Sequence, residues 1–414
     1  MAASTDRPRA ASGDRPKSSS TRRAEPGEFE LLAKVRAAVE KLGRGRGVIV
    51  GIGDDCAVVE PPRRRRASAD GRTPAGASAN AAPPLVLTTD TMVEGVHFHA
   101  DWLTPRELGV RAFRAAVSDI AAMGARPRYV LLSLEIPGAE HGFGAREALA
   151  LVRGVAADAR RTGAALVGGN VSGGARTGVT VTVVGEAAGT PLLRSAARAG
   201  DLVFVTGSLG GAAAGYRALL ASRQKSPRDS GDERARRAAT AAYRRPPLRL
   251  AFAAALAEQG LANAMVDISD GLLQDLGHVA QASRVAIRIE AASVPVHRVA
   301  MRTAARSPAA LRVAGAASSK ASPVELALTG GEDYELAFTA PKSRRAAIEK
   351  LAARLRTPIE VIGSVEKGRA AVTDSGGRPF AVPVPGFDHL RARGDKKTVR
   401  SRRAPARART TRTR

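Results

Sequence analysis

The chain has 414 residues, 44% of them hydrophobic, so it is long enough to bury a large core and to form two domains of ordinary size. Its single cysteine, Cys56, excludes an internal disulfide, and one Cys with six scattered His gives no zinc-ligand spacing. The net charge of +26 suggests a nucleic-acid partner, so its distribution along the chain matters.

The positive excess falls in five segments rich in Arg, Ala, Pro and Ser, and the remaining chain is close to neutral. Such segments are predicted to be disordered tails and inserted loops rather than parts of the folded domains. They are residues 1–27, 61–84, 223–245, 302–323 and 391–414. No stretch approaches the roughly 20 apolar residues that span a bilayer. No apolar run follows the first basic residues, so we expect a cytoplasmic protein without a membrane partner.

Residues 28–188 are predicted to form a first α/β domain, in which strands alternate with helices. Thr104, Pro105 and Glu107 form a capping box with Pro at the first helical position, which predicts a helix ending near Gly124. The other elements follow from apolar spacing. Helices are expected at 27–42 and 144–163, and strands at 47–55, 84–91, 128–137, 164–170 and 178–189.

Residues 189–390 are predicted to form a second α/β domain. It begins with a strand, a glycine turn and a helix over 200–219. A helix is expected at 246–260, and a strand, an acidic turn and a helix over 264–283. Further strands are expected within 285–295, 325–341 and 359–368.

Carboxylates at the predicted turns are the most informative feature. Asp119 lies in an apolar helical context, where an unpaired buried carboxylate costs several kcal/mol or takes up a proton. Several acids converging from separate turns suit divalent cations, and oxygen ligands without a His or Cys cluster favour Mg²⁺. The acids at turns are Asp54, Asp55, Asp90, Asp267, Asp270, Glu332 and Asp333.

Other interpretations of these residues stay open at this point. A single Asp at the end of a strand is more often a turn former, and Asp270 can cap the helix that starts at Gly271. Lys or Arg can also neutralise such acids. The glycine turns at 206–215 and 167–174 can bind phosphate through backbone N–H groups, but neither has the P-loop pattern. Phosphoryl transfer by positioning and metals is the simplest chemistry for this combination.

Nine motifs in order resemble the thiamine-monophosphate kinase family, from Gly27 to Leu390 without the basic insertions. They are GEFELL, GIGDDCAVV, TTDTMVEGVHF, VSDIAAMGARP, LVGGN, LLRSAARAGD, VDISDGLLQDLGH, TGGEDYELAF and GFDHL. The resemblance implies a two-domain α/β subunit of the aminoimidazole ribonucleotide synthetase-like superfamily. It also implies a homodimer in which first-domain strands form a shared barrel, and direct transfer of the ATP γ-phosphoryl to thiamine monophosphate, assisted by several Mg²⁺ ions.

The resemblance also implies roles for individual residues. Catalysis would depend on Asp90, Asp119 and Asp267. The implied metal ligands are Asp55, Thr88, Thr89, Asp90, Asp119, Asp267 and Asp270. The implied ATP contacts are Gly169, Asn170, Arg194 and Ser269. His97, Glu332 and Phe387 would hold the substrate.

One position departs from the pattern of many family members, which have Asp where this chain has Asn170. The change removes a negative charge, so the metal role of this position stays open. Two alternatives remain: another ATP-dependent enzyme of the superfamily, or a protein that binds nucleic acid through its Arg-rich tails.

Overall fold

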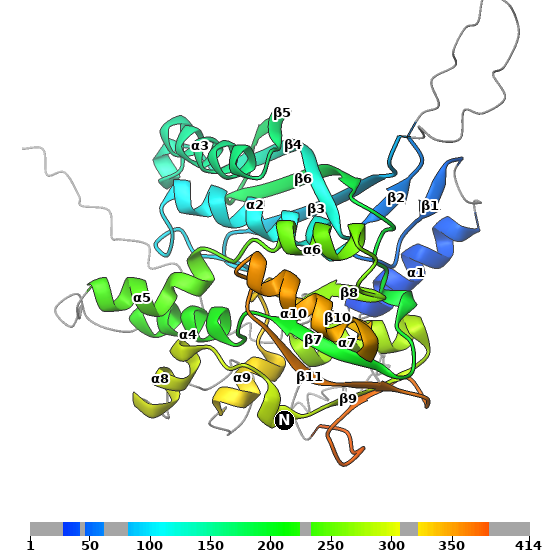
Figure 1. The fold of residues 1–414 in the computed structure, drawn as a ribbon. Helices are drawn as coiled ribbons and strands as arrows, with labels where there is room; N and C mark the ends of the chain where they lie inside the picture. The colour runs from blue at the N-terminus through cyan, green and yellow to red at the C-terminus, as the bar shows by residue number, and fades with distance from the viewer. Residues whose placement is uncertain (1–27, 42–45, 62–81, 224–232, 307–321, 381–414) are drawn as a thin grey trace, which may run out of the picture.

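The computed structural model describes residues 28–41, 46–61, 82–223, 233–306 and 322–380. Two six-stranded sheets, each with one parallel pair among antiparallel pairs, form the framework of the molecule. The first sheet lies above the second in Figure 1, and helices pack against both. None of the helices in these ranges combines the length and the apolar character needed to cross a bilayer.

The first sheet has the strand order β1-β2-β3-β6-β4-β5. Its strands are β1 (Val48–Val50), β2 (Ala57–Val59), β3 (Leu85–Val93), β4 (Ala125–Ile136), β5 (Ala165–Gly173) and β6 (Gly178–Ala187). Helices α2 (Pro105–Ala122) and α3 (Ala145–Arg161) contact this sheet and each other. Burial alternates along β4, so that Val130 and Leu132 join the core while Tyr129 and Leu131 are exposed. One face of the sheet therefore carries the core, and the opposite face of β4 and β5 is uncovered.

The second sheet has the strand order β12-β9-β11-β7-β10-β8. Its strands are β7 (Asp201–Thr206), β8 (Ala264–Asp267), β9 (Ala286–Ile289), β10 (Leu336–Pro341), β11 (Ile359–Glu366) and β12 (Ala371–Thr373). Helices α7 (Leu272–Ser283) and α9 (Pro323–Thr329) share a core cluster with one face. Helices α6 (Leu250–Glu258) and α10 (Arg345–Arg354) share another, which also includes Ala121 and Ala122 of α2. In Figure 1, α6 accordingly lies between the first sheet and α10, which is drawn over the second sheet.

Three more helices lie together at the lower left of Figure 1: α4 (Gly211–Arg223), α5 (Glu233–Arg244) and α8 (Arg298–Arg306). The prediction of a disordered insertion over 223–245 is wrong for α5, because Tyr243 and Thr240 of this helix are fully buried. Alanine-rich sequence favours a helix, and Tyr243 gives that helix an anchor in the core. The expected insertion at 302–323 likewise begins inside α8.

Local capping signals in the sequence account for where helices α2 and α9 begin. Thr104 and Glu107 form the predicted reciprocal cap of α2. Residues 325–329, expected in a strand, instead belong to α9, which a second capping box of Ser322 and Glu325 starts. Helix α1 (Glu28–Glu40) forms where predicted.

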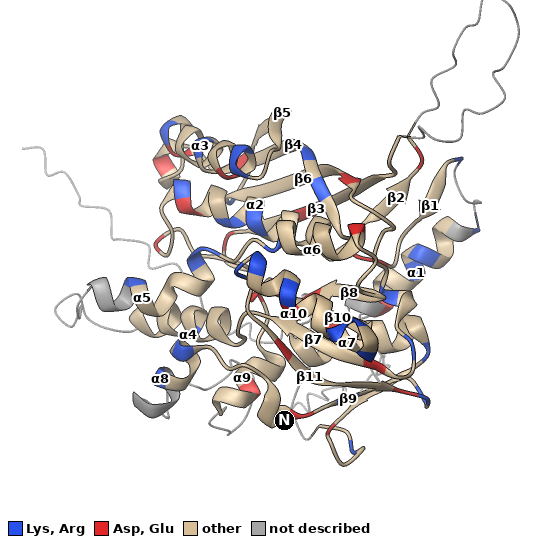
Figure 2. Cartoon of the chain, in the orientation of Figure 1, with Lys and Arg blue, Asp and Glu red and all other residues tan. Residues whose placement is uncertain are grey.

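Lys and Arg are spread over several helices rather than gathered on one element (Figure 2). The expected tails at 1–27 and 391–414 lie outside the described residues.

Candidate active site

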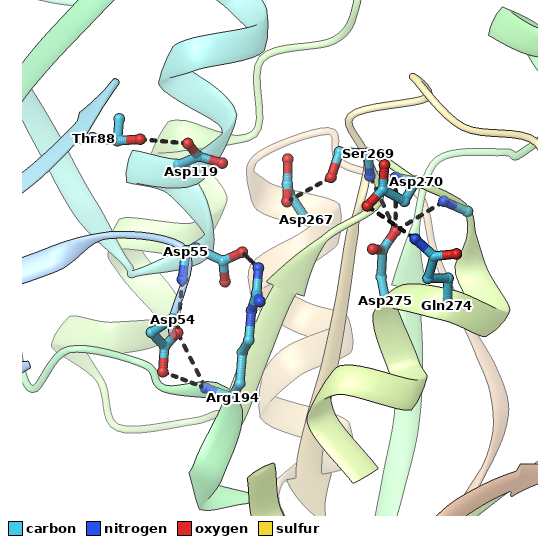
Figure 3. A network of polar contacts seen from close by, with 11 residues as sticks. Asp54, Asp55, Thr88, Asp119, Arg194, Asp267, Ser269, Asp270, Gln274 and Asp275 are labelled. Carbon is cyan, nitrogen blue, oxygen red and sulfur yellow. Dashed lines mark hydrogen bonds and ion pairs between the residues drawn. The ribbon is translucent and has the colours of Figure 1, made fainter. Parts of the chain in front are cut away.

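Three carboxylates from distant parts of the sequence meet between the two sheets (Figure 3). Asp55 lies in the turn between β1 and β2, Asp119 lies in the last turn of α2, and Asp267 ends β8. One oxygen of each lies within 4.8 Å of one oxygen of the other two. The fold thus brings acids from both predicted domains into one cluster, which is called the acidic cluster below.

Burial and mutual repulsion raise the pKa values of two carboxyl groups in the acidic cluster. Burial, together with the charges of Asp267 and Asp55, raises the pKa of Asp119 well above its usual value, although the Thr88 hydroxyl donates to Asp119 Oδ2 at 2.5 Å. Burial, followed by the charge of Asp55, raises the pKa of Asp267 to about 7. Burial and the same acids raise the pKa of the adjacent Cys56 thiol, which therefore stays protonated and unreactive.

Two oxygen atoms in the acidic cluster test whether it suits a metal. Oδ2 of Asp55 and Oδ2 of Asp267 are buried and have no hydrogen-bond partner among the described residues. Buried carboxylate oxygens without donors, set close together, fit a hard divalent cation because it supplies the missing positive charge. The donors are all oxygens, as Mg²⁺ prefers. The residues present therefore fit the predicted metal.

Arg194 is the basic residue that the structure places against these acids. Its guanidinium pairs with Asp55 Oδ1, and its backbone N–H donates to Asp54 Oδ2 at 3.2 Å. Burial alone would lower the pKa of Arg194, but the neighbouring Asp55 more than offsets it and the pKa is raised. Burial, then the charge of Asp55, raises the pKa of Asp54 to about 6. Arg194 thus remains charged beside the cluster, as a phosphate contact requires.

A second group of acids shapes the turn between β8 and α7. Asp275 Oδ2 accepts hydrogen bonds from the backbone N–H groups of Ser269, Asp270 and Gly271 at 3.1, 3.2 and 3.0 Å. Asp270 does not cap α7, because the cap residue is Gly271, without a side-chain hydrogen bond. Sequence reasoning missed Asp275, although an acid in the first turn of a helix after a glycine is a usable signal.

A cavity of about 310 Å³ opens beside the acidic cluster. It is lined by residues of both sheets and by α2 and α4. Among the predicted site residues, its lining includes Thr89, Asp90, His97, Asp119, Asp267, Ser269, Asp270 and Glu332. Met92, Tyr216 and Tyr334 also line it, and no motif had pointed to Tyr216. The cavity is thus bounded by five of the seven predicted metal ligands, all but Asp55 and Thr88, and also by two of the predicted substrate contacts.

Other predicted residues lie away from the cavity or use their polar groups for contacts within the fold. Gly169 and Asn170 are exposed on β5, which β6 and β4 separate from β3, a distance of about 14 Å at ordinary strand spacing. Thr89 lines the cavity, but its hydroxyl pairs with that of Thr182 at 3.0 Å. Asp333 instead accepts N–H bonds from residues 210 and 212 at 2.6 and 3.0 Å, at the start of α4. Phe387 lies outside the described residues.

Comparison with known proteins identifies the family. Residues 53–187 match the model for AIR synthase related protein, N-terminal domain, and residues 198–375 match the model for its C-terminal domain. Thiamine-monophosphate kinase of Escherichia coli K12 is 31% identical over 370 residues, covering 88% of this chain and 98% of that protein. The Mycobacterium tuberculosis H37Rv enzyme of the same name is 36% identical over 305 residues, covering 72% and 78%.

Solved structures give the same relationship. The structure described as AaThiL complexed with AMPPCP and TMP superposes with a TM-score of 0.68 at 30% identity, covering 88% of this chain and 97% of that one. With both domain models matched and a relative aligned over nearly its whole length, the chain belongs to the thiamine-monophosphate kinase family of the AIR synthase related proteins.

Proposed function

We propose that this protein transfers the γ-phosphoryl group of ATP to thiamine monophosphate and forms thiamine diphosphate. The observation that carries the proposal is the meeting of Asp55, Asp119 and Asp267 beside a cavity, in a chain of this family. The similar structure of AaThiL, which holds AMPPCP and TMP, supports the same pair of substrates.

Mg²⁺ is the proposed metal, and the residues that would hold it are the acidic cluster with Asp90 and Asp270 at the cavity wall. Thr88 and Thr89 are proposed as supporting oxygen ligands. When bound, Mg²⁺ ions neutralise phosphate charge and help to align the transferred group.

The protein's own residues would bind and orient the two substrates. Arg194, held by Asp55, can donate to phosphate oxygens, and the Ser269 hydroxyl lies at the cavity wall beside Asp267. His97 and Glu332 line the cavity and would contact thiamine monophosphate. Because the acceptor is itself a phosphate, alignment and charge neutralisation are the main requirements of the reaction.

The direct test is incubation of the purified protein with ATP, Mg²⁺ and thiamine monophosphate, followed by chromatography. We expect thiamine diphosphate and ADP in equal amounts, with no product when either Mg²⁺ or thiamine monophosphate is left out. ADP formation that does not depend on thiamine monophosphate would reject the proposed substrate and favour another ATP-dependent activity of the superfamily.

Mg²⁺ binding is expected to tighten as the pH rises from about 6 to about 8. The pKa of Asp267 is raised to about 7, so below this pH the carboxyl carries a proton that a cation must displace. Calorimetric titration of the metal-free protein in buffers of different ionisation enthalpy measures the protons released. Release should be larger at pH 6 than at pH 8, and an equal release at both would contradict the assignment.

A homodimer is proposed through the uncovered face of the first sheet. Tyr129, Leu131 and Val167 on β4 and β5 are 43–58% exposed and apolar. Two such faces packed together would form a barrel and bury these side chains. The arrangement would also give Gly169 and Asn170, on the edge strand, a place near the partner's cavity, which accounts for their distance from the acidic cluster of their own chain.

Replacing Leu131, on the uncovered face of β4, with Asp is therefore expected to shift the protein from dimer to monomer, because a buried interface charge is strongly unfavourable. Light scattering after size-exclusion chromatography measures the mass directly. Leu149→Asp serves as the matched control: Leu149 is 50% exposed on α3, away from the proposed face, and its replacement should leave the mass unchanged. A monomeric wild-type protein would reject the dimer.

A further inference from the structure

Arg111 of α2 is fully buried and lies behind the cavity, where it contacts the lining residue Glu332. It pairs with Glu332 Oε1 at 2.5 Å, donates to the backbone carbonyl of Tyr243, and its guanidinium carbon lies 3.8 Å from the centre of the Tyr243 ring. Burial alone would lower the pKa of Arg111, but the Glu332 carboxylate more than offsets this and the pKa is raised. The buried cation therefore holds the Glu332 carboxylate in one position.

Tyr243 connects this cation to the other side of the cavity. Its hydroxyl donates to the backbone carbonyl of His97 at 2.5 Å. Its ring also packs edge-on against Trp102, with centroids 5.9 Å apart, so the side chain has little freedom to move. The residue comes from α5, a helix far in sequence from both His97 and Arg111.

The backbone at Glu332 shows why such support is needed. Glu332 has φ of 67°, in the left-handed region that non-glycine residues rarely adopt. Its N–H donates to the carbonyl of Ser269 at 2.7 Å. This hydrogen bond connects the strained residue to the turn that follows Asp267 of the acidic cluster. A conformation of this kind persists where surrounding contacts determine it, and the ion pair with Arg111 is one of them.

We infer that Arg111 and Tyr243 are positioning residues that set the distance and orientation between His97 and Glu332 at the substrate end of the cavity. The role rests on the proposed function. Glu332 Oε1 is used by Arg111, and Glu332 lines the cavity, so its carboxylate is presented to a ligand from one fixed side. A carboxylate held in this way suits a cationic heteroaromatic ring, such as the thiazolium of thiamine monophosphate, rather than the nucleotide.

Tyr243→Phe is the sharpest test, because it removes only the hydroxyl bonded to His97. We expect the KM for thiamine monophosphate to rise about tenfold, the effect of one well-placed hydrogen bond, while kcat and the KM for ATP stay within about twofold. Arg111→Lys keeps the charge but not the forked contacts, so it should raise the same KM without changing that for ATP.

Thr240→Val is the matched control. It removes another fully buried hydroxyl from α5, one that accepts from Arg244 at 2.9 Å and donates to the carbonyl of Arg237 at 3.4 Å. This variant should lose stability yet keep both KM values. A normal KM for thiamine monophosphate in Tyr243→Phe, or an equal rise in both KM values, would overturn the inference while wild-type turnover upholds the proposed function. Absence of turnover in the wild type would reject the proposed function and this role together.

Discussion

Asp119→Asn is expected to lower the rate of thiamine monophosphate phosphorylation by about 10²- to 10³-fold. Asp119 meets both Asp55 and Asp267 and lines the cavity, so its charge acts on the whole acidic cluster. Asparagine has nearly the same size and can still accept the hydrogen bond of Thr88. The fold should therefore survive, because the substitution removes a buried negative charge rather than a packing group.

Single-turnover kinetics at saturating Mg²⁺ measure this effect, with circular dichroism to confirm that the variant is folded. Glu349→Gln is a suitable control, because Glu349 is half-exposed on α10 and, within the part of the chain that the structure describes, pairs only with Arg345 of the same helix. Its turnover should match that of the wild type. A rate within about threefold of wild type for Asp119→Asn would contradict the metal role of the acidic cluster.

Asp158→Ala is expected to lower the free energy of unfolding by about 3–5 kcal/mol, because it leaves a buried cation without its partner. Asp158 Oδ2 accepts from Arg114 Nε at 2.5 Å, and both side chains are less than 10% exposed. Arg114 also donates to the carbonyl of Pro246 at 2.5 Å, which alone cannot neutralise its charge. The pair joins α2 to α3, so its loss affects the main helical layer of the first sheet.

Urea unfolding followed by circular dichroism measures the loss. Arg161→Ala is the control, because Arg161 also contacts Asp158, at 3.4 Å, but its side chain is 62% exposed. This surface pair should contribute less than about 1 kcal/mol. If both substitutions changed the unfolding midpoint equally, burial of the Arg114 pair would not explain its contribution.

Local signals in the sequence predicted much of the fold. The capping box at Thr104 determined where α2 begins, and apolar spacing predicted most strands of both sheets. Helix α5 was missed because its sequence is mostly Arg and Ala. Tyr243 of this helix is buried against Trp102 and Tyr216, and this packing stabilises the helix. The contacts are tertiary, so the local sequence does not reveal them.

The sequence also predicted part of the candidate site. A resemblance and a concentration of acids at turns identified Asp55, Asp119 and Asp267, which the structure places together. Arg111 was not predictable in the same way, because it acts on Glu332, which is distant in sequence. No local pattern distinguishes such a residue from an ordinary helical acid or base.

Helix α2 has a consequence for the kinds of sequence change this protein can accept. Four polar residues along it have separate partners: Glu107 contacts Arg244, Arg111 contacts Glu332, Arg114 contacts Asp158, and Asp119 contacts Thr88. Each helical residue turns the next by about 100°, so deleting one residue between Glu107 and Asp119 would misdirect every side chain beyond it. Insertions and deletions within this helix should therefore be eliminated during evolution, because a single one disturbs several partners at once.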